Sequence, residues 1–172
     1  MQVFTLARAG VVGLSYLMIS SCAGTGSSGE KNFESHYVTA RTALEQGDYA
    51  KADRTYMALL PDSGALQPRL RLELSHSYLR AGKFAAASKE AGSLADGENG
   101  TARAAALSVM ATAEHEMGLQ ALAKGDTKTA TSYLKQAETA LTEVLATNPD
   151  LDPLGSLAGR KASIIARLNG LR

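Results

Sequence analysis

The chain has 172 residues, of which 45% are hydrophobic, and its formal net charge at pH 7 is +1. This length suits one domain with a substantial core. The near-neutral charge excludes the basic excess that is typical of nucleic-acid-binding proteins. The only cysteine, Cys22, excludes an internal disulfide and any metal site that needs two thiolates.

The first 21 residues have the pattern of a secretory signal peptide. Arg8 supplies a positive charge, and an apolar run of 11 residues from Ala9 to Ile19 follows it. This run is shorter than the roughly 20 residues that a membrane-spanning helix needs, and it has the usual length of an export signal. We therefore expect residues 1–21 to be a cleaved signal peptide.

The residues Ile19-Ser20-Ser21-Cys22 resemble the lipobox of bacterial lipoproteins, which has an aliphatic residue, two small residues and a cysteine. The resemblance implies cleavage before Cys22 and acylation there. Two or more acyl chains hold a protein stably on a bilayer. Because the next residue is Ala23, not the Asp associated with inner-membrane retention, the resemblance favours the outer membrane, facing the periplasm. The alternative is a chance cysteine in an uncleaved signal anchor.

After the cysteine, residues 22–32 begin with a run of small residues from Ala23 to Gly29. Gly/Ser-rich segments behave as flexible coils, so we expect residues 22–32 to be a tether and residues 33–172 to be the folded domain. Cleavage removes Arg8 alone among the charged residues, which leaves 17 basic and 17 acidic side chains. Since the mature chain has no polybasic patch, the lipid is its only evident membrane contact.

Past Glu30 the chain is rich in strong helix formers, and nothing in it alternates with a period of two over the length of a strand. Two sets of apolar residues recur at helical spacing: Phe33, Tyr37, Ala40 and Leu44, and further on Leu70, Leu74 and Tyr78. Such spacing places apolar side chains on one face of an amphipathic helix. The sequence therefore predicts an all-α fold.

Glycine marks three turns between the predicted helices, because glycine just past a helix end adopts the left-handed conformation without steric cost. The turns are Gln46-Gly47-Asp48-Tyr49, Ala81-Gly82-Lys83-Phe84 and Lys124-Gly125-Asp126-Thr127. Their glycines are 35 and 43 residues apart. The first interval is close to the roughly 34-residue period of tetratricopeptide repeats.

The residues around these turns resemble the tetratricopeptide repeat family. Small residues stand at the same offset after each turn, namely Ala52, Ala87 and Ala130, and Tyr56 supplies the aromatic of the first repeat. The resemblance implies a short α-solenoid with repeats at about 33–66, 67–100 and 110–149. Gly118 stands where the family has a close-packing glycine, whereas Leu59 and Leu94 replace its second small residue.

The third repeat departs from the family in length, because Pro149 lies 24 residues past Gly125, where the family has about 17. An insertion of two helical turns accounts for the difference and preserves the helix face. We therefore expect one long helix from Thr127 to Thr147. Residues 156–169 are expected to form a helix that caps the last repeat.

No catalytic or metal-binding pattern stands out in the chain. His36, His76 and His115 lie about 40 residues apart, and the acids beside His115 point in other directions on a helix. The chain lacks the usual nucleophile, zinc-protease and phosphate-loop motifs. We therefore expect no enzyme activity, no metal and no cofactor.

The family resemblance implies a concave groove lined by the first helix of each repeat. Its polar and aromatic lining would be Tyr37, Arg41, Arg69, His76, Arg80 and His115, with the leucines Leu44, Leu72, Leu79, Leu119 and Leu122. We expect the groove to hold a segment of an envelope protein, with Arg41 and Arg80 pairing with acidic groups. The alternative is that these are ordinary surface residues and that Leu72, Leu79, Leu119 and Leu122 belong to the core.

These features together predict a membrane-anchored periplasmic lipoprotein that acts as a protein-interaction scaffold in an envelope assembly. The partner would be a protein, with no nucleic acid and no evident small-molecule substrate. One alternative is a lipoprotein of pilus or secretion-system assembly. The other, from a different class, is an envelope enzyme or ligand-binding subunit without a recognisable motif. Fold alone does not choose among these functions.

Overall fold

The computed structural model describes the backbone of residues 28–171 and the side chains of residues 32–171. The predicted signal peptide, Cys22 and most of the predicted tether lie outside these residues. The described part is all-helical and has no strand, which confirms the predicted fold class. Its helices are α1 (Ser28–Gln46), α2 (Tyr49–Leu59), α3 (Gln67–Arg80), α4 (Phe84–Gly97), α5 (Gly100–Ala123), α6 (Thr127–Thr147) and α7 (Ser156–Gly170), with short 3₁₀ helices η1 (Leu60–Asp62), η2 (Gly64–Leu66) and η3 (Pro149–Leu151).

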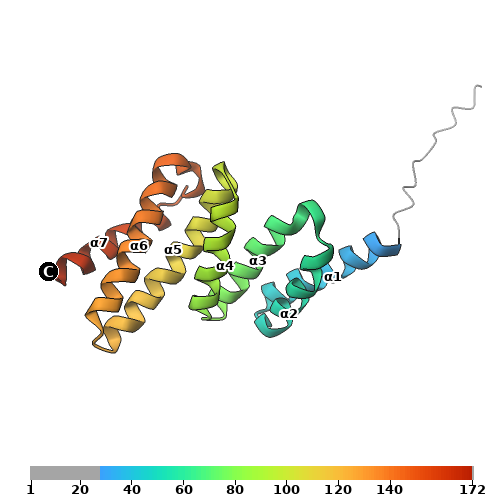
Figure 1. The fold of residues 1–172 in the computed structure, drawn as a ribbon, viewed down its shortest axis with the longest axis horizontal. Helices are drawn as coiled ribbons and strands as arrows, with labels where there is room; N and C mark the ends of the chain where they lie inside the picture. The colour runs from blue at the N-terminus through green and yellow to red at the C-terminus, as the bar shows by residue number, and fades with distance from the viewer. Residues whose placement is uncertain (1–27, 172) are drawn as a thin grey trace, which may run out of the picture.

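The helices pack in chain order into an elongated array (Figure 1). The three predicted glycine turns are confirmed: Gly47, Gly82 and Gly125 have φ angles of 80°, 71° and 77°. In two of the turns the following aspartate caps the next helix, since Asp48 accepts a hydrogen bond from the Lys51 amide and Asp126 from the Thr129 amide. Each turn therefore folds its two helices into an antiparallel hairpin.

Helix boundaries match the sequence-based expectation at α6, which spans Thr127–Thr147 as predicted. They differ at the start of two helices. Helix α1 begins at Ser28, so it includes the last five residues assigned to the tether, and α5 begins at Gly100, ten residues before the expected start of the third repeat. Residues 101–109 contain neither glycine nor proline, so nothing in their sequence interrupts the longer α5.

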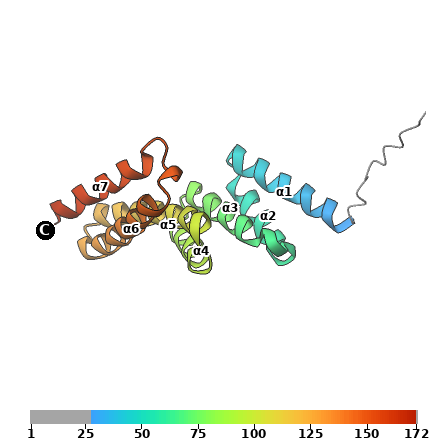
Figure 2. The same cartoon turned by 90° about the horizontal axis from the view of Figure 1, so that it is seen from above.

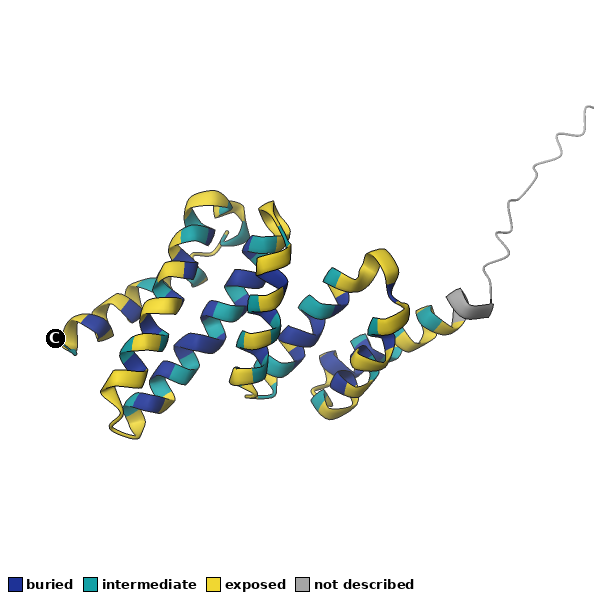
Figure 3. Cartoon of the chain, in the orientation of Figure 1, coloured by how far each residue is buried: buried dark blue, intermediate teal, exposed yellow. Residues whose placement is uncertain are grey.

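Helix α5 contacts α3, α4 and α6, and most of its residues are buried or half-buried (Figure 3). Its buried residues surround the helix instead of forming one stripe, which is the pattern of an interior helix. Most of them are small: Ala104, Ala106, Ala111, Ala113, Gly118 and Ala121. Small side chains let the neighbouring helices approach the α5 backbone closely.

Two clusters of buried apolar residues form the core. The first joins α1, α2 and α3 around Tyr56, Leu70 and Leu74, and the second joins α4 to α7 around Leu134 and Ile164. Partly buried Leu72 of α3 packs against the second cluster, as does Leu122 of α5. These two predicted groove leucines therefore contact the core, in the direction of the alternative interpretation, and stay half-buried.

Gly118 of α5 lies in close contact with α6. A Cβ at this position would lie 2.9 Å from Cγ and Cδ2 of Leu134 and 3.5 Å from the carbonyl oxygen of Ala130. Leu134 is fully buried, so it has little freedom to move aside. The glycine thus has the close-packing role that the sequence predicted.

We predict that Gly118→Ala lowers the free energy of unfolding. Overpacking of a well-packed core costs about 1–3 kcal/mol, and this cost exceeds the helix-propensity gain of about 1 kcal/mol. Gly159→Ala in α7 is the matched control, because no heavy atom lies within 4 Å of its Cβ position. Chemical denaturation should show opposite signs for the two variants. A Gly118→Ala protein as stable as the Gly159→Ala protein would contradict the packing role.

Candidate functional site

Helices α1 and α7 lie on the same side of the array (Figure 2). In Figure 2, α1 and α7 lie at one edge of the molecule, α4 and α6 at the opposite edge, and α3 and α5 between them. A trough with a volume of about 280 Å³ opens on the α1 and α7 side, between α3, α5 and α7. This trough is the candidate site, and of the residues predicted to line the groove only His76 and Leu79 line it.

The floor of the trough is one face of α5. Ala105, Ser108, Val109 and Thr112 stand at intervals of three, one and three residues, which places them on the same side of the helix. All four side chains are small or medium in size, so an occupant can approach the α5 backbone closely. The walls are His76 and Leu79 of α3, Leu151 of η3, and Ser156 and Leu157 of α7.

Two hydroxyl groups of the floor already donate hydrogen bonds within α5. The Ser108 hydroxyl donates to the Ala104 carbonyl oxygen and the Thr112 hydroxyl to the Ser108 carbonyl oxygen, each at 2.8 Å. Each hydroxyl oxygen keeps acceptor capacity for a donor in the trough. The floor therefore combines an apolar surface with two acceptor positions.

Asp152 positions the start of α7. Its carboxylate accepts hydrogen bonds from the backbone amides of Leu157 and Ala158, both at 2.9 Å, and from the Ser156 hydroxyl at 3.0 Å. Desolvation by burial opposes ionisation, but these hydrogen bonds outweigh it and lower the pKa of Asp152. The cap thereby fixes the segment that carries the trough residues Ser156 and Leu157.

Arg160 connects α7 to α5. The Arg160 guanidinium donates to Nδ1 of His115 at 2.9 Å and to the Glu116 carboxylate at 3.1 Å. Because a guanidinium has no acceptor, Nδ1 must carry the lone pair, and the neutral ring holds its proton on Nε2. Nε2 is buried and has no hydrogen-bond partner among the described residues.

At the other end of the array, the buried carboxylate of Glu73 in α3 connects three helices. It accepts hydrogen bonds from the hydroxyls of Tyr37 in α1 at 2.7 Å and Tyr56 in α2 at 2.6 Å. Arg69 Nε lies 3.2 Å and an Arg41 nitrogen 3.3 Å from the same carboxylate. Two tyrosines and two arginines therefore satisfy one buried acid.

The electrostatics of this cluster follow from its burial. Desolvation alone would raise the pKa of Glu73, but the hydrogen bonds from Tyr56, Tyr37 and Arg69 and the charge of Arg41 outweigh it and lower that pKa. Burial, together with the hydrogen bond to Glu73, raises the pKa of Tyr56. Glu73 thus stays ionised and the tyrosines stay protonated, which suits a structural junction better than acid–base chemistry.

The structure separates the six predicted groove residues into different surroundings. Tyr37, Arg41 and Arg69 gather around Glu73, and Arg69 also lies over the Tyr37 ring at 5.6 Å from its centre. Arg80 is exposed and lies 5.5 Å from the centre of the Tyr49 ring. His115 is buried beside Arg160, so only His76 lines the trough.

These contacts bear on the predicted role of the arginines. Arg41 pairs with Glu73 and, at 3.2 Å, with Glu45, so internal carboxylates already occupy its guanidinium. Because these pairs already neutralise Arg41, the proposed function does not rest on it.

Sequence reasoning missed Glu73 and the contribution of α7. Glu73 lies three residues before His76 on α3, and only tertiary packing brings the two tyrosines to it. The floor had a visible signal, because Ala105, Ser108 and Thr112 recur at helical spacing. Because the third repeat was expected to start at residue 110, residues 105 and 108 were not assigned to its first helix.

Two further findings concern the described residues alone. No group of three histidine, cysteine, aspartate or glutamate side chains there is arranged to hold a metal ion. None of the helices there combines the length and the hydropathy that a membrane crossing requires.

We predict that His115 makes the stability of the protein depend on pH. Burial first, and then the charge of Arg160, lower its pKa in the folded state, although Glu116 opposes this. The unfolded chain therefore binds the proton more readily. The stabilisation of the fold by neutral His115 is complete above the ordinary histidine pKa of about 6.5. It is lost as the pH falls through the lowered pKa of His115 in the folded state.

Denaturation of the wild type and of His115→Gln across pH 7.5 to 5 measures this effect. The wild type should lose free energy of unfolding relative to the variant as the pH falls. His36→Gln, at an exposed position on α1, is the matched control, and its free energy of unfolding should change with pH as that of the wild type does. Parallel pH profiles for the wild type and His115→Gln would refute the prediction.

No protein-family model, no curated protein and no solved structure matches this chain in the comparisons.

Proposed function

We propose that the protein is a lipid-anchored, tetratricopeptide-like interaction module of the bacterial cell envelope, and that the trough between α3, α5 and α7 holds a segment of a partner protein. The anchor rests on the lipobox-like residues before Cys22 and the Gly/Ser-rich run after it. The antiparallel helix hairpins and their glycine turns support the repeat interpretation. We propose the outer membrane, facing the periplasm, as the location.

The observation that carries the binding proposal is the composition of the trough. Apolar walls that include Leu79, Leu151 and Leu157 flank a floor of small and medium residues. Apolar surface of this kind gains about 25 cal/mol for each Å² that a partner removes from water. A peptide or a helix can lie against such a floor because no long side chain rises from it. The hydroxyls of Ser108 and Thr112 offer acceptors for its donors.

The anchor has a direct test in the native host. We predict that the full chain fractionates with the membrane and that Cys22→Ser moves it to the soluble fraction, because the thiol is the atom that is acylated. Ser21→Ala is the control, since it keeps a small residue before the cysteine and should leave the protein on the membrane. Retention of the Cys22→Ser protein in the membrane pellet would overturn the anchoring proposal.

The trough is tested by capture of cross-linked partners from envelope membranes. We predict that Thr112→Arg, which places a long charged side chain in the trough, lowers recovery of the partner about tenfold or more. This corresponds to a loss of about 1.4 kcal/mol or more. Thr131→Arg on α6 is the matched control. The Thr131 hydroxyl, like that of Thr112, donates to the carbonyl oxygen four residues earlier, and Thr131 lies outside the trough.

Both threonine variants must melt cooperatively, so that loss of capture is not loss of fold. Equal recovery by Thr112→Arg and Thr131→Arg would exclude the trough as the docking site. Recovery of a small ligand and no protein would favour a ligand-binding subunit over an interaction module.

A further inference from the structure

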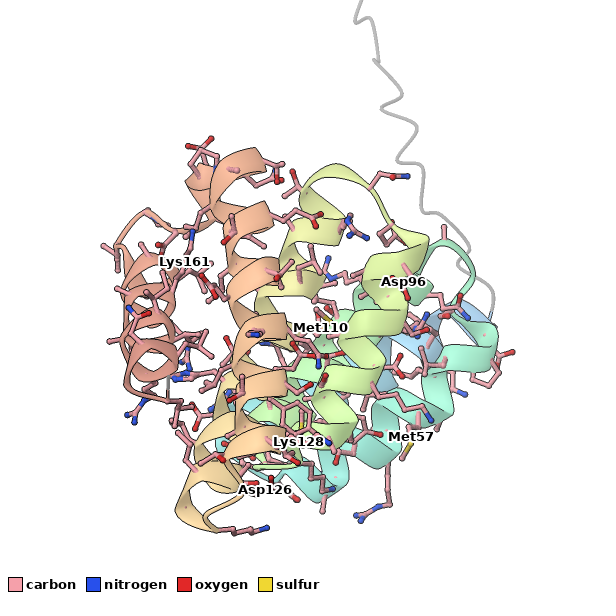
Figure 4. All side chains as sticks on the ribbon, turned by 60° about the vertical axis from the view of Figure 1, so that its left-hand side comes forward. Met57, Asp96, Met110, Asp126, Lys128 and Lys161 are labelled. Atoms are coloured by element: carbon pink, nitrogen blue, oxygen red, sulfur yellow. The ribbon has the colours of Figure 1, made fainter. Side chains whose placement is uncertain are left out.

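A second concavity lies on the side of α5 that faces away from the trough. It is a groove between α4 and α6 with a volume of about 410 Å³. Its floor is formed by Leu107, Met110 and Glu114 of α5, which recur at intervals of three and four residues and so share one helix face. Figure 4 shows Met110 between α4 and α6. The groove is thus open to an occupant that does not touch the trough.

Glu114 is the unusual residue of this groove. Only 4% of it is exposed, and one of its carboxylate oxygens, Oε1, accepts a hydrogen bond from the Ser88 hydroxyl at 3.3 Å. The other, Oε2, is buried and has no hydrogen-bond partner among the described residues. Burial of an unpaired carboxylate is costly, and here it raises the pKa of Glu114. An external cation that reached Oε2 would remove this cost.

The cations that line the groove do not pair with Glu114. Arg103, at one end, donates to the Glu143 carboxylate at 2.7 Å and to the Ala95 carbonyl oxygen at 2.7 Å. Lys135 lines the α6 wall, and the Glu114 carboxylate has Ser88 as its hydrogen-bond partner among the described residues. With Arg103 paired to Glu143, the two remaining acids that line the groove, Glu114 and Asp96, outnumber its one remaining cation, Lys135.

The walls beside Glu114 suit an aliphatic chain. Gly92 and Ala95 of α4 leave space above Leu107 and Met110. A Cβ on Gly92 would lie 3.2 Å from the sulfur of Met110, so the missing side chain is what accommodates the methionine. Methionine is flexible and adapts to the shape of an apolar partner. The groove therefore places an adjustable apolar slot next to a buried acid.

We propose that this groove binds a lysine side chain of a partner polypeptide. The methylene groups of the lysine pack on Leu107 and Met110, and its ammonium group donates to Oε2 of Glu114. The groove runs along α5 from Arg103 to Glu114, about 16 Å of helix, which exceeds the length of one lysine side chain. The remaining length accommodates neighbouring residues of a peptide, which a free alkylamine lacks. The site does not depend on the proposed role of the trough.

The test is an NMR titration of the protein labelled at its methionine ε-methyl groups. The probe is Nα-acetyl-lysine N-methylamide, and the norleucine analogue, with the same carbon chain and no amine, is the ligand control. We expect the lysine probe to cause a saturable shift of the Met110 methyl signal. We expect no shift at Met57, which is exposed on α2.

The matched protein variants are Glu114→Gln and Glu34→Gln, which change the net charge equally. Glu114→Gln should weaken binding of the lysine probe about tenfold or more, because a buried charged partner is lost. Glu34→Gln on α1 should leave it unchanged. Glu114→Gln should fold, because it removes a buried carboxylate whose ionised form is disfavoured by burial. The carboxyl ¹³C titration of Glu114 should move to lower pH when the lysine probe is bound.

Three results would overturn the proposal. The first is the absence of a saturable Met110 shift with the lysine probe. The second is equal binding of the lysine probe by the wild type and by Glu114→Gln, or equal binding of the norleucine analogue. The third is binding of free pentylammonium without binding of the lysine probe, which would assign the groove to small amines instead of a polypeptide.

Discussion

The close packing of α5 against its neighbours is the constraint on which the rest of the structure depends. Most buried residues of α5 are small, and at Gly118 even a methyl group would collide with Leu134. Dispersion contacts between closely packed backbones are individually weak and collectively large. Because α4 and α6 cover one side of α5 while α3 and α7 flank the other, this packing also creates both concavities. The groove and the trough are consequences of the same interior helix.

The buried polar groups differ between the two halves of the array. In the first half they are satisfied: Glu73 has four donors, and Asp53 accepts from the Ser77 hydroxyl at 2.6 Å and from Lys83 Nζ at 2.8 Å. In the second half Glu114 and His115 each leave one atom without a partner among the described residues. Satisfied buried groups specify how helices pair, whereas an unsatisfied one costs free energy that a ligand can return. This difference is consistent with our proposal that partners bind around α5.

The sequence predicted the helices, their turns and the close packing at Gly118, but it missed the buried polar contacts between helices. The turns at Gly47, Gly82 and Gly125 were predictable because a positive φ angle favours glycine at a helix end. The Glu73 cluster was not, because its tyrosines come from two other helices. Nor was the unpaired state of Glu114, because an isolated glutamate in a helical sequence is usually solvated. Helical spacing predicts which residues share a helix face, but it does not predict which side chains of other helices they contact.

The order of the helices relates the proposed anchor to the proposed binding surfaces. Helix α1 begins at Ser28 at one end of the array, and α7 ends at the other (Figure 1). The trough and the groove both lie between α3 and α7. An acyl chain on Cys22 would therefore hold the protein by the end that has neither concavity. Since the two concavities open on different sides of α5, a polypeptide in one would leave the other accessible. Under the proposed function, one anchored molecule has room for two partner segments at once, as a scaffold requires.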